Sequence, residues 1–314
     1  MSDDLSETKN TPLRRDMRTL QRMLLDGQTS SAIELSGSLL MRSRSKDERD
    51  PFSEARIRME RALIGAVEPS MVGAELRWCV DRLNALNEGL MLELTDFCSV
   101  IRNDVKTRLV VFRSNAKNFS VGADLKEPRS KETKLFQWKH NRGKDLIQAI
   151  LNIEQITICL LQGYCLGGAA VIASACDFRI AEENTKVGYP EINFGMNLNW
   201  LGLPLAINLV GVSRAKQMVI GGDFHDAEQL ASWGFIDEIF TAKNRKLCLK
   251  KWVTKYAAKP PLAAQMIKRS SNELAMNLFK GIMHMEFEQF MLSASTEDHK
   301  KAIEGFLAKK PVKF

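Results

Sequence analysis

The chain has 314 residues, of which 45% are hydrophobic and 26% are charged, with 19 glycines and 9 prolines. This composition is ordinary for a globular protein and excludes fibrous and predominantly disordered classes. The formal net charge of +7 favours anionic partners, such as phosphorylated small molecules or acidic proteins, without choosing among them.

Residues 1–70 are predicted to form an N-terminal extension that is partly helical or disordered. Apolar residues recur at roughly helical spacing between Leu20 and Leu40. In the following segment, Arg42–Arg61, acidic residues are interleaved with the basic ones, so we interpret it as a solvated helix face or linker and not as a nucleic-acid-binding patch. The polar start has no apolar signal region, and no apolar run is long enough to span a bilayer. We therefore expect a cytoplasmic protein that binds neither membranes nor nucleic acid.

Residues 71–260 alternate between strand-like and helix-like segments. Two β, α, β units are predicted, each with an apolar strand, an amphipathic or small-residue helix, and a second apolar strand. Their segments are 75–81, 87–104 and 108–115 for the first unit, and 155–164, 167–177 and 178–183 for the second. This alternation predicts an α/β core whose mostly parallel strands are buried on both faces. Residues 261–314 carry apolar positions at helical spacing and are predicted to be helical.

Six cysteines lie mostly in apolar runs and form no CxxC pair. They are therefore expected to be buried, reduced thiols. The four histidines show no spacing that is typical of a metal site, so we expect no metal.

Two turns carry small residues where a predicted strand meets a predicted helix, 118–125 (NFSVGADL) and 162–170 (QGYCLGGAA). In the second turn, Gly167 and Gly168 leave room for a ligand to approach the backbone, and the helix that follows would point free N–H groups at that space. A Gly-Gly pair in this place is more often a sign of close packing. Together, however, the two turns could hold one negatively charged oxygen.

Four segments, FSVGADLKE, QGYCLGGAAVIASACDFRIA, VGYPEINFG and GGDFHDAEQLASWGFIDEIF, resemble in this order the signature blocks of the crotonase (enoyl-CoA hydratase/isomerase) superfamily. The resemblance covers about residues 75–310. It implies a spiral of ββα units, a helical C-terminal region that forms homotrimers or homohexamers, and an acyl-CoA substrate, with no cofactor other than the coenzyme A of that substrate. It also assigns an oxyanion hole to the backbone N–H groups of Ala123 and Gly168, which would stabilise an enolate.

One catalytic carboxyl group is expected. Hydratases of this superfamily carry two glutamates, and the matching positions in this chain are Val171 and Glu191. Because hydration needs a water held between two carboxyl groups, a single glutamate is better suited to moving a proton between carbons. Glu191 could instead be an ordinary helix-start residue after Pro190.

The resemblance also implies a set of substrate-binding residues. Arg82 and Lys126 are expected near the phosphates of coenzyme A, although both could be solvated surface charges. Val171 is expected to form an apolar wall of the site, and Trp200, where the superfamily often has a glycine-rich loop, either narrows the acyl pocket or belongs to the core. The full set is Arg82, Val121, Asp124, Leu125, Lys126, Gly167, Val171 and Trp200.

The resemblance and the single glutamate together predict an enoyl-CoA isomerase- or hydratase-like enzyme. Two alternatives remain open. The first is a decarboxylase or dehydratase that acts on an acyl group bound to coenzyme A or to an acidic acyl carrier protein, which the net charge of +7 would suit. The second is a catalytically silent crotonase-fold scaffold, which Val171 permits and Glu191 argues against.

Overall fold

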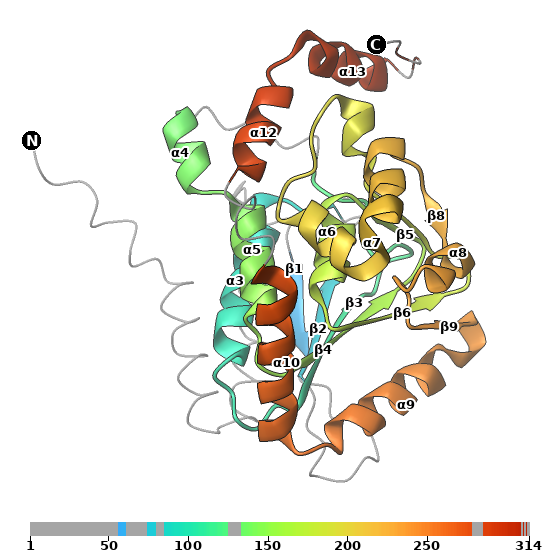
Figure 1. Cartoon of the computed structure of the whole chain (residues 1–314). Coiled ribbons are helices and arrows are strands. Elements are labelled where there is room, and N and C mark those ends of the chain that lie inside the picture. The colour runs from blue at the N-terminus through green and yellow to red at the C-terminus, as the bar shows by residue number, and fades with distance from the viewer. Residues whose placement is uncertain are drawn as a thin grey trace, which may run out of the picture.

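The computed structural model describes residues 56–60, 74–79, 85–124, 133–277 and 285–308, together with Lys310 and Val312. Within these residues the strands form two sheets (Figure 1). The larger sheet has the order β1-β2-β3-β4-β6-β9, with bounds Arg56–Glu60, Ala74–Cys79, Leu109–Ser114, Ile156–Leu161, Phe178–Glu182 and Glu238–Phe240. The smaller sheet has the order β5-β7-β8, with bounds Tyr164–Leu166, Lys186–Gly188 and His225–Asp226.

The larger sheet is parallel from β2 to β9, and β1 pairs with β2 in the antiparallel direction. The central strands β3 and β4 are buried along almost their whole length. Burial on both faces is what a parallel sheet requires, because its crossover connections place helices over each face. The predicted α/β class is confirmed.

The chain passes between the two sheets in a repeating pattern. β4 in the larger sheet is followed by β5 in the smaller sheet and by helix α6 (Gly168–Ala175). β6 and β7 repeat the step, and lead through a 3-10 helix, η2 (Pro190–Phe194), to helix α7 (Gly202–Gly221). These are two ββα units, and each small-sheet strand brings the chain to the N-terminal end of the next helix.

The interpretation of Arg42–Arg61 as a helix face or linker is wrong for Arg56–Glu60, which form strand β1. β1 pairs with β2 over its whole length, so the sheet includes a segment before residue 70, where we placed the start of the core. Residues 1–55 and 61–73 lie outside the described residues, and a helical or disordered extension there stays a prediction.

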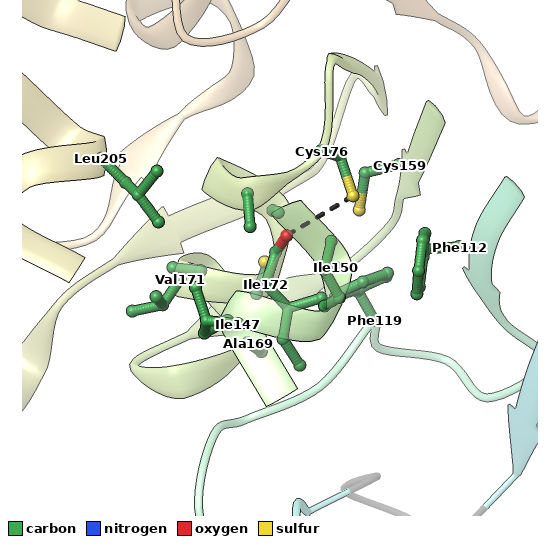
Figure 2. Packing of buried hydrophobic residues seen from close by; sticks show 14 of the residues in the cluster. Phe112, Phe119, Ile147, Ile150, Cys159, Ala169, Val171, Ile172, Cys176 and Leu205 are labelled. Atoms are coloured by element: carbon green, nitrogen blue, oxygen red, sulfur yellow. Dashed lines mark hydrogen bonds between the residues drawn. The ribbon is translucent and has the colours of Figure 1, made fainter. Parts of the chain in front are cut away.

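The main hydrophobic core lies between the larger sheet and four helices, α3 (Glu88–Ile101), α5 (Arg142–Leu151), α6 and α7. Every residue of α6 is buried, and its small side chains let neighbouring helices approach closely. Figure 2 shows part of this core, in which Ile147 and Ile150 of α5 pack near Ile172 of α6. The cysteines whose side chains the structure describes, Cys98, Cys159, Cys165, Cys176 and Cys248, are buried and unbridged, as predicted.

A second cluster covers the opposite face of the larger sheet. Helix α9 (Arg245–Ala257) places Trp252 and Val253 against Val111 of β3 and Ile158 of β4. Two short elements complete this half of the chain, α8 (Ala227–Ser232) and the 3-10 helix η3 (Ala242–Asn244).

The C-terminal part is helical where it is described, in α10 (Pro261–Asn277), α12 (Glu286–Ser293) and α13 (Glu297–Leu307). α12 and α13 lie on the side of the molecule that carries η2 and the short helix α4 (Lys134–Lys139), at the top of Figure 1. None of the described helices combines the length and the apolar character that crossing a membrane requires.

Candidate active site

The N-terminal end of α6 presents three backbone amides that precede its first helical hydrogen bond. Gly167, which precedes the helix, has a φ of 56°, a left-handed conformation that glycine adopts without strain. The first helical hydrogen bond joins the amide of Val171 to the carbonyl of Gly167 at 3.1 Å. The N–H groups of Gly168, Ala169 and Ala170 therefore precede the helical ladder and point out of the helix end.

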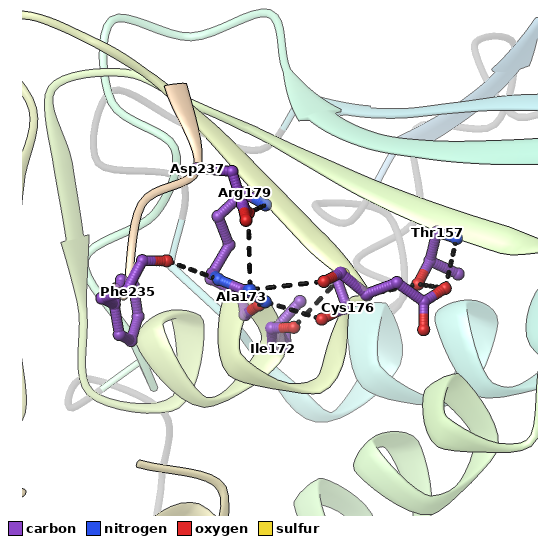
Figure 3. A network of polar contacts seen from close by, with 8 residues as sticks. Thr157, Ile172, Ala173, Cys176, Arg179, Phe235 and Asp237 are labelled. Atoms are coloured by element: carbon purple, nitrogen blue, oxygen red, sulfur yellow. Dashed lines mark hydrogen bonds and ion pairs between the residues drawn. The ribbon is translucent and has the colours of Figure 1, made fainter. Parts of the chain in front are cut away.

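Arg179 fixes the other end of α6 (Figure 3). This side chain is 3% exposed, and its guanidinium donates to the carbonyls of Cys176 at 2.7 Å, Ala173 at 3.4 Å and Phe235 at 2.6 Å. It also pairs with the Asp237 carboxylate at 3.5 Å. A cation at a helix C-terminus satisfies carbonyls that have no helical partner, so Arg179 anchors the helix that carries the site.

The first small-residue turn lies directly against the second. The amide of Leu166 donates to the carbonyl of Ser120 at 3.0 Å. Gly122, with a φ of 92°, is so close to the second turn that an added Cβ would lie 2.7 Å from the Leu166 carbonyl oxygen. Ala123 is exposed and follows this contact, as Gly168 follows Gly167 on the other chain segment. The structure therefore brings together the two turns that the sequence singled out.

Glu191 reaches the second turn from η2. Strands β5 and β7 are parallel, and the amide of Gly167 donates to the carbonyl of Gly188 at 2.9 Å. Tyr189 is fully buried and shares a hydrogen bond of 2.7 Å with Ser174 of α6, which ties η2 to that helix. The Glu191 carboxyl then lies over Gly167, where an added Cβ would be 2.8 Å from Glu191 Oε1.

The Glu191 carboxyl is in an unusual environment. The residue is partly exposed, but Oε2 is shielded from solvent and has no hydrogen-bond partner among the described residues. Burial raises the pKa of Glu191 to about 7, opposed by a backbone hydrogen bond that lowers it. In a simple capping role after Pro190 the carboxylate would accept from amides two or three residues further along the helix, whereas the backbone hydrogen bond of the Glu191 carboxyl is with its own residue. Glu191 is instead suited to accept and release a proton near neutral pH.

Val171 and Trp200 are apolar residues that pack beside the N-terminal end of α6. Val171 is 1% exposed, and its Cγ2 lies 2.9 Å from where a Cβ on Gly202 would be, at the start of α7. Trp200 is partly exposed, and its indole lies against Gly168, where an added Cβ would be 1.9 Å from Cζ3. Trp200 thus packs on the core and lies beside the α6 amides at the same time.

The C-terminal helices hold the segment between Glu191 and α7. The amide of Asn197 donates to Ser293 Oγ at 2.9 Å, and its side-chain nitrogen donates to Gln289 Oε1 at 3.0 Å. His299 Nδ1 lies 2.7 Å from the carbonyl oxygen of Phe194. α12 and α13 therefore contribute to the geometry of the site although they lie about a hundred residues further along the chain.

Glu286 is a site residue that the sequence reasoning missed. It is 7% exposed, and its carboxyl accepts hydrogen bonds from the amides of Leu201 and, at 3.4 Å, Leu203. Burial raises its pKa to about 7, while these two bonds and the nearby charge of Lys144 lower it. In the sequence, polar and apolar positions are mixed around Glu286, and no local signal distinguishes it from a surface charge.

Of the other expected binding residues, the structure describes only two. Val121 and Asp124 belong to the first turn and are both partly exposed. Arg82, Leu125 and Lys126 lie outside the described residues, so their contact with coenzyme A stays a prediction.

Comparison with known proteins matches the sequence of this chain to one family. The Enoyl-CoA hydratase/isomerase family model matches residues 80–314. A crotonyl-CoA hydratase of Syntrophomonas wolfei subsp. wolfei is 28% identical over 233 residues, which cover 74% of this chain and 90% of that protein. A 2,3-dehydroadipyl-CoA hydratase of Escherichia coli K12 is 30% identical over 234 residues, with the same two coverages of 74% and 90%.

Solved structures with the same fold have lower sequence identity. The crystal structure of an enoyl-CoA hydratase from Mycobacterium avium subsp. paratuberculosis gives a TM-score of 0.70 at 18% identity, and covers 83% of this chain and 98% of that one. An enoyl-CoA hydratase/isomerase from Pseudoalteromonas atlantica gives 0.68 at 19%, with coverages of 83% and 99%. The chain is therefore an enzyme of the enoyl-CoA hydratase/isomerase family, within the crotonase superfamily.

Proposed function

We propose that this enzyme binds an acyl-CoA thioester and moves a proton on its acyl group, with Glu191 as the single catalytic carboxyl. The observation that carries the proposal is the placement of the Glu191 carboxyl over Gly167, beside the amide of Gly168, which precedes the first hydrogen bond of α6. The names of the relatives, which are hydratases of CoA thioesters, support the substrate class.

The backbone amides of Ala123 and Gly168 would bind the thioester oxygen. When the carboxylate of Glu191 removes a proton from the carbon next to the thioester, the C–H bonding electrons form a carbon–carbon double bond and the carbonyl electrons move to oxygen. Two fixed N–H donors stabilise this enolate without solvent reorganisation, each by about 2.7–4 kcal/mol in comparable sites. With a 3-enoyl substrate, Glu191 then returns the proton to the far end of the conjugated system, which moves the double bond.

Val171 makes isomerisation the favoured reaction over hydration. Its side chain is apolar and buried at the position where a second carboxyl group would help to hold a water. A carboxyl with a pKa of about 7 is half ionised near neutral pH, so one group can serve as base and then as acid.

The direct test is an NMR experiment with a 3-enoyl-CoA and a 2-enoyl-CoA, each incubated with the enzyme in deuterated water. We expect double-bond migration and α-deuterium incorporation to be faster than formation of the 3-hydroxy product. Hydration of crotonyl-CoA at about 10 per second or more, an ordinary enzymatic rate, would contradict the single-carboxyl proposal. Loss of carbon dioxide or water from a suitable acyl group would instead favour the decarboxylase or dehydratase alternative.

We further propose that the enzyme assembles as a homotrimer or homohexamer. Helix α10 exposes several large apolar side chains, among them Leu262, Met266, Ile267 and Leu274. Exposed apolar surface of this kind on one element is typical of an interface between subunits. Light scattering coupled to size-exclusion chromatography would test the assembly, and a stable monomer at micromolar concentration would contradict it.

A further inference from the structure

The backbone of the segment before α7 is strained at two successive residues. Trp200 has a φ of 63° and Leu201 a φ of 64°, and these are the two non-glycine residues with positive φ in the part of the chain that the structure describes. Bulky residues rarely adopt this left-handed conformation, and they keep it only where surrounding contacts enforce it. The position of the Trp200 side chain is therefore determined by its neighbours.

Two polar groups hold this backbone. Asn199 Oδ1 accepts a hydrogen bond from the amide of Trp200 at 2.7 Å, and another from Asn141 Nδ2 at 3.2 Å. Beyond Trp200, the buried carboxyl of Glu286 accepts from the amide of Leu201. The residue before and the residue after Trp200 are thus both anchored, the first to the start of α5 and the second to α12.

The anchored backbone directs the indole of Trp200 between two glycines. An added Cβ on Gly143, in α5, would lie 1.8 Å from Trp200 Cε2, and an added Cβ on Gly168, in α6, would lie 1.9 Å from Cζ3. Neither position could hold even an alanine without moving the ring. Glycine disfavours a helix, so its presence near the start of both helices indicates that the space is reserved for the indole.

We propose that Trp200 sets the length of the acyl group that the site accepts, and that the enzyme acts on short-chain acyl thioesters. The inference rests on the proposed function, in which the thioester oxygen binds the Gly168 amide. The acyl carbons then begin beside Gly168 and Glu191, and the indole on Gly168 meets them within the first few carbons. Two open surface depressions, one along α7 and one between α3 and α5, include neither Gly168 nor Trp200.

The test measures binding and not turnover, so it stands apart from the assay for isomerisation. Saturated butyryl-, octanoyl- and dodecanoyl-CoA are titrated into the wild type and the Trp200→Gly variant by calorimetry. Glycine removes the indole and adopts a positive φ without strain, so the backbone conformation at residue 200 can be retained. Each methylene that becomes buried should tighten binding about fourfold.

For the wild type we expect affinity to stop rising, or to fall, beyond the butyryl chain. Trp200→Gly should tighten dodecanoyl-CoA by about tenfold or more relative to butyryl-CoA, since several methylenes enter the vacated space. Trp200→Phe, with a smaller ring, should give an intermediate chain-length profile. If Trp200→Gly folds poorly, the comparison of Trp200→Phe with the wild type still tests the inference.

Trp233→Ala is the matched control. Trp233 is also partly buried, but it lies against His225 and Arg214, away from Gly168. Its loss should leave the ratio of dodecanoyl to butyryl affinity unchanged. Equal chain-length profiles in the wild type and Trp200→Gly would overturn the inference while leaving proton transfer intact. If no acyl-CoA binds any of these proteins, the proposed function fails, and the inference fails with it.

Discussion

Two segments meet at the N-terminal end of α6, the Gly167–Gly168 turn and the Trp200–Leu201 segment, and different contacts fix their left-handed backbones. The Gly167–Gly168 turn reaches its left-handed conformation with glycine, and it is fixed by sheet pairing and by the helix that follows. The Trp200–Leu201 segment has the same kind of backbone with two bulky residues, and depends on polar anchors from other parts of the chain. Under the proposed function, the first segment binds the thioester oxygen and the second limits the acyl chain.

The largest effect is expected from the anchor of the glycine turn. Replacing Arg179 by Met leaves buried carbonyls of Cys176 and Phe235 without donors, so we expect the free energy of unfolding to fall by about 3–5 kcal/mol. Denaturant unfolding measures this change. The control Arg214→Met removes an exposed arginine near Trp233 and should change stability by less than about 1 kcal/mol. Similar losses for both variants would show that α6 does not depend on Arg179.

A second change tests which reaction the glycine turn supports. Val171→Glu places a carboxyl in a buried apolar position, so we expect a loss of about 1–3 kcal/mol in the free energy of unfolding. It should also add measurable hydration of crotonyl-CoA, followed by absorbance of the conjugated thioester. A folded variant that isomerises but gains no hydration would mean that Val171 does not occupy the position of a water-binding carboxyl.

Glu286, which anchors the Trp200–Leu201 segment, should contribute less to the free energy of unfolding than Arg179. Glu286→Gln keeps one acceptor for the amides of Leu201 and Leu203, and we expect a loss of about 1–2 kcal/mol, with weaker discrimination between butyryl- and dodecanoyl-CoA. Glu288→Gln, an exposed position on the same helix, is the control and should alter neither property by more than about 0.5 kcal/mol. Loss of stability without any change in chain-length discrimination would separate Glu286 from the acyl pocket.

A further effect concerns the pH dependence of stability. Burial raises the pKa of Glu191 from 4.5 to about 7, so its protonated form is favoured in the folded state. The contribution of this protonation to the free energy of unfolding is fully present below pH 4.5 and is lost as pH rises through about 7. We expect Glu191→Gln to reduce this loss by about 1–3 kcal/mol, measured by denaturant unfolding between pH 5 and 8. A wild type and variant with parallel pH curves would contradict the raised pKa.

The activity of the wild type should respond to pH in the opposite direction. Proton removal requires the carboxylate, so kcat/KM for isomerisation should rise with pH and level off above about 7.

The sequence predicted the parts of the fold and site that local patterns determine. Alternating apolar segments predicted the α/β core, and the resemblance to the crotonase superfamily implied its ββα units. The two small-residue turns and Glu191 stood out because each lies in a contiguous block that resembles a signature of that superfamily. Strand β1 was missed because charged residues alternate with Ile57 and Met59, a pattern that also suits a solvated segment.

The environment of Trp200 could not be predicted for a different reason. Its indole contacts Gly143, and its backbone depends on Glu286, both far away in the sequence. Glu286 and Glu288 lie in the same helical turn, and no local signal separates the buried anchor from the surface charge. Long-range polar contacts of this kind become visible only when the helices are packed.

The central claim is that Glu191 and the two turn amides form and hold an enolate, and one measurement tests it most directly. Butyryl-CoA is saturated, so it can neither be hydrated nor isomerised, and exchange of its α-protons in deuterated water reports enolate formation alone. We predict exchange by the wild type, and a rate lower by about 10²–10⁴ for Glu191→Gln with little change in butyryl-CoA affinity. Equal exchange by the two proteins, or none by the wild type, would contradict the claim.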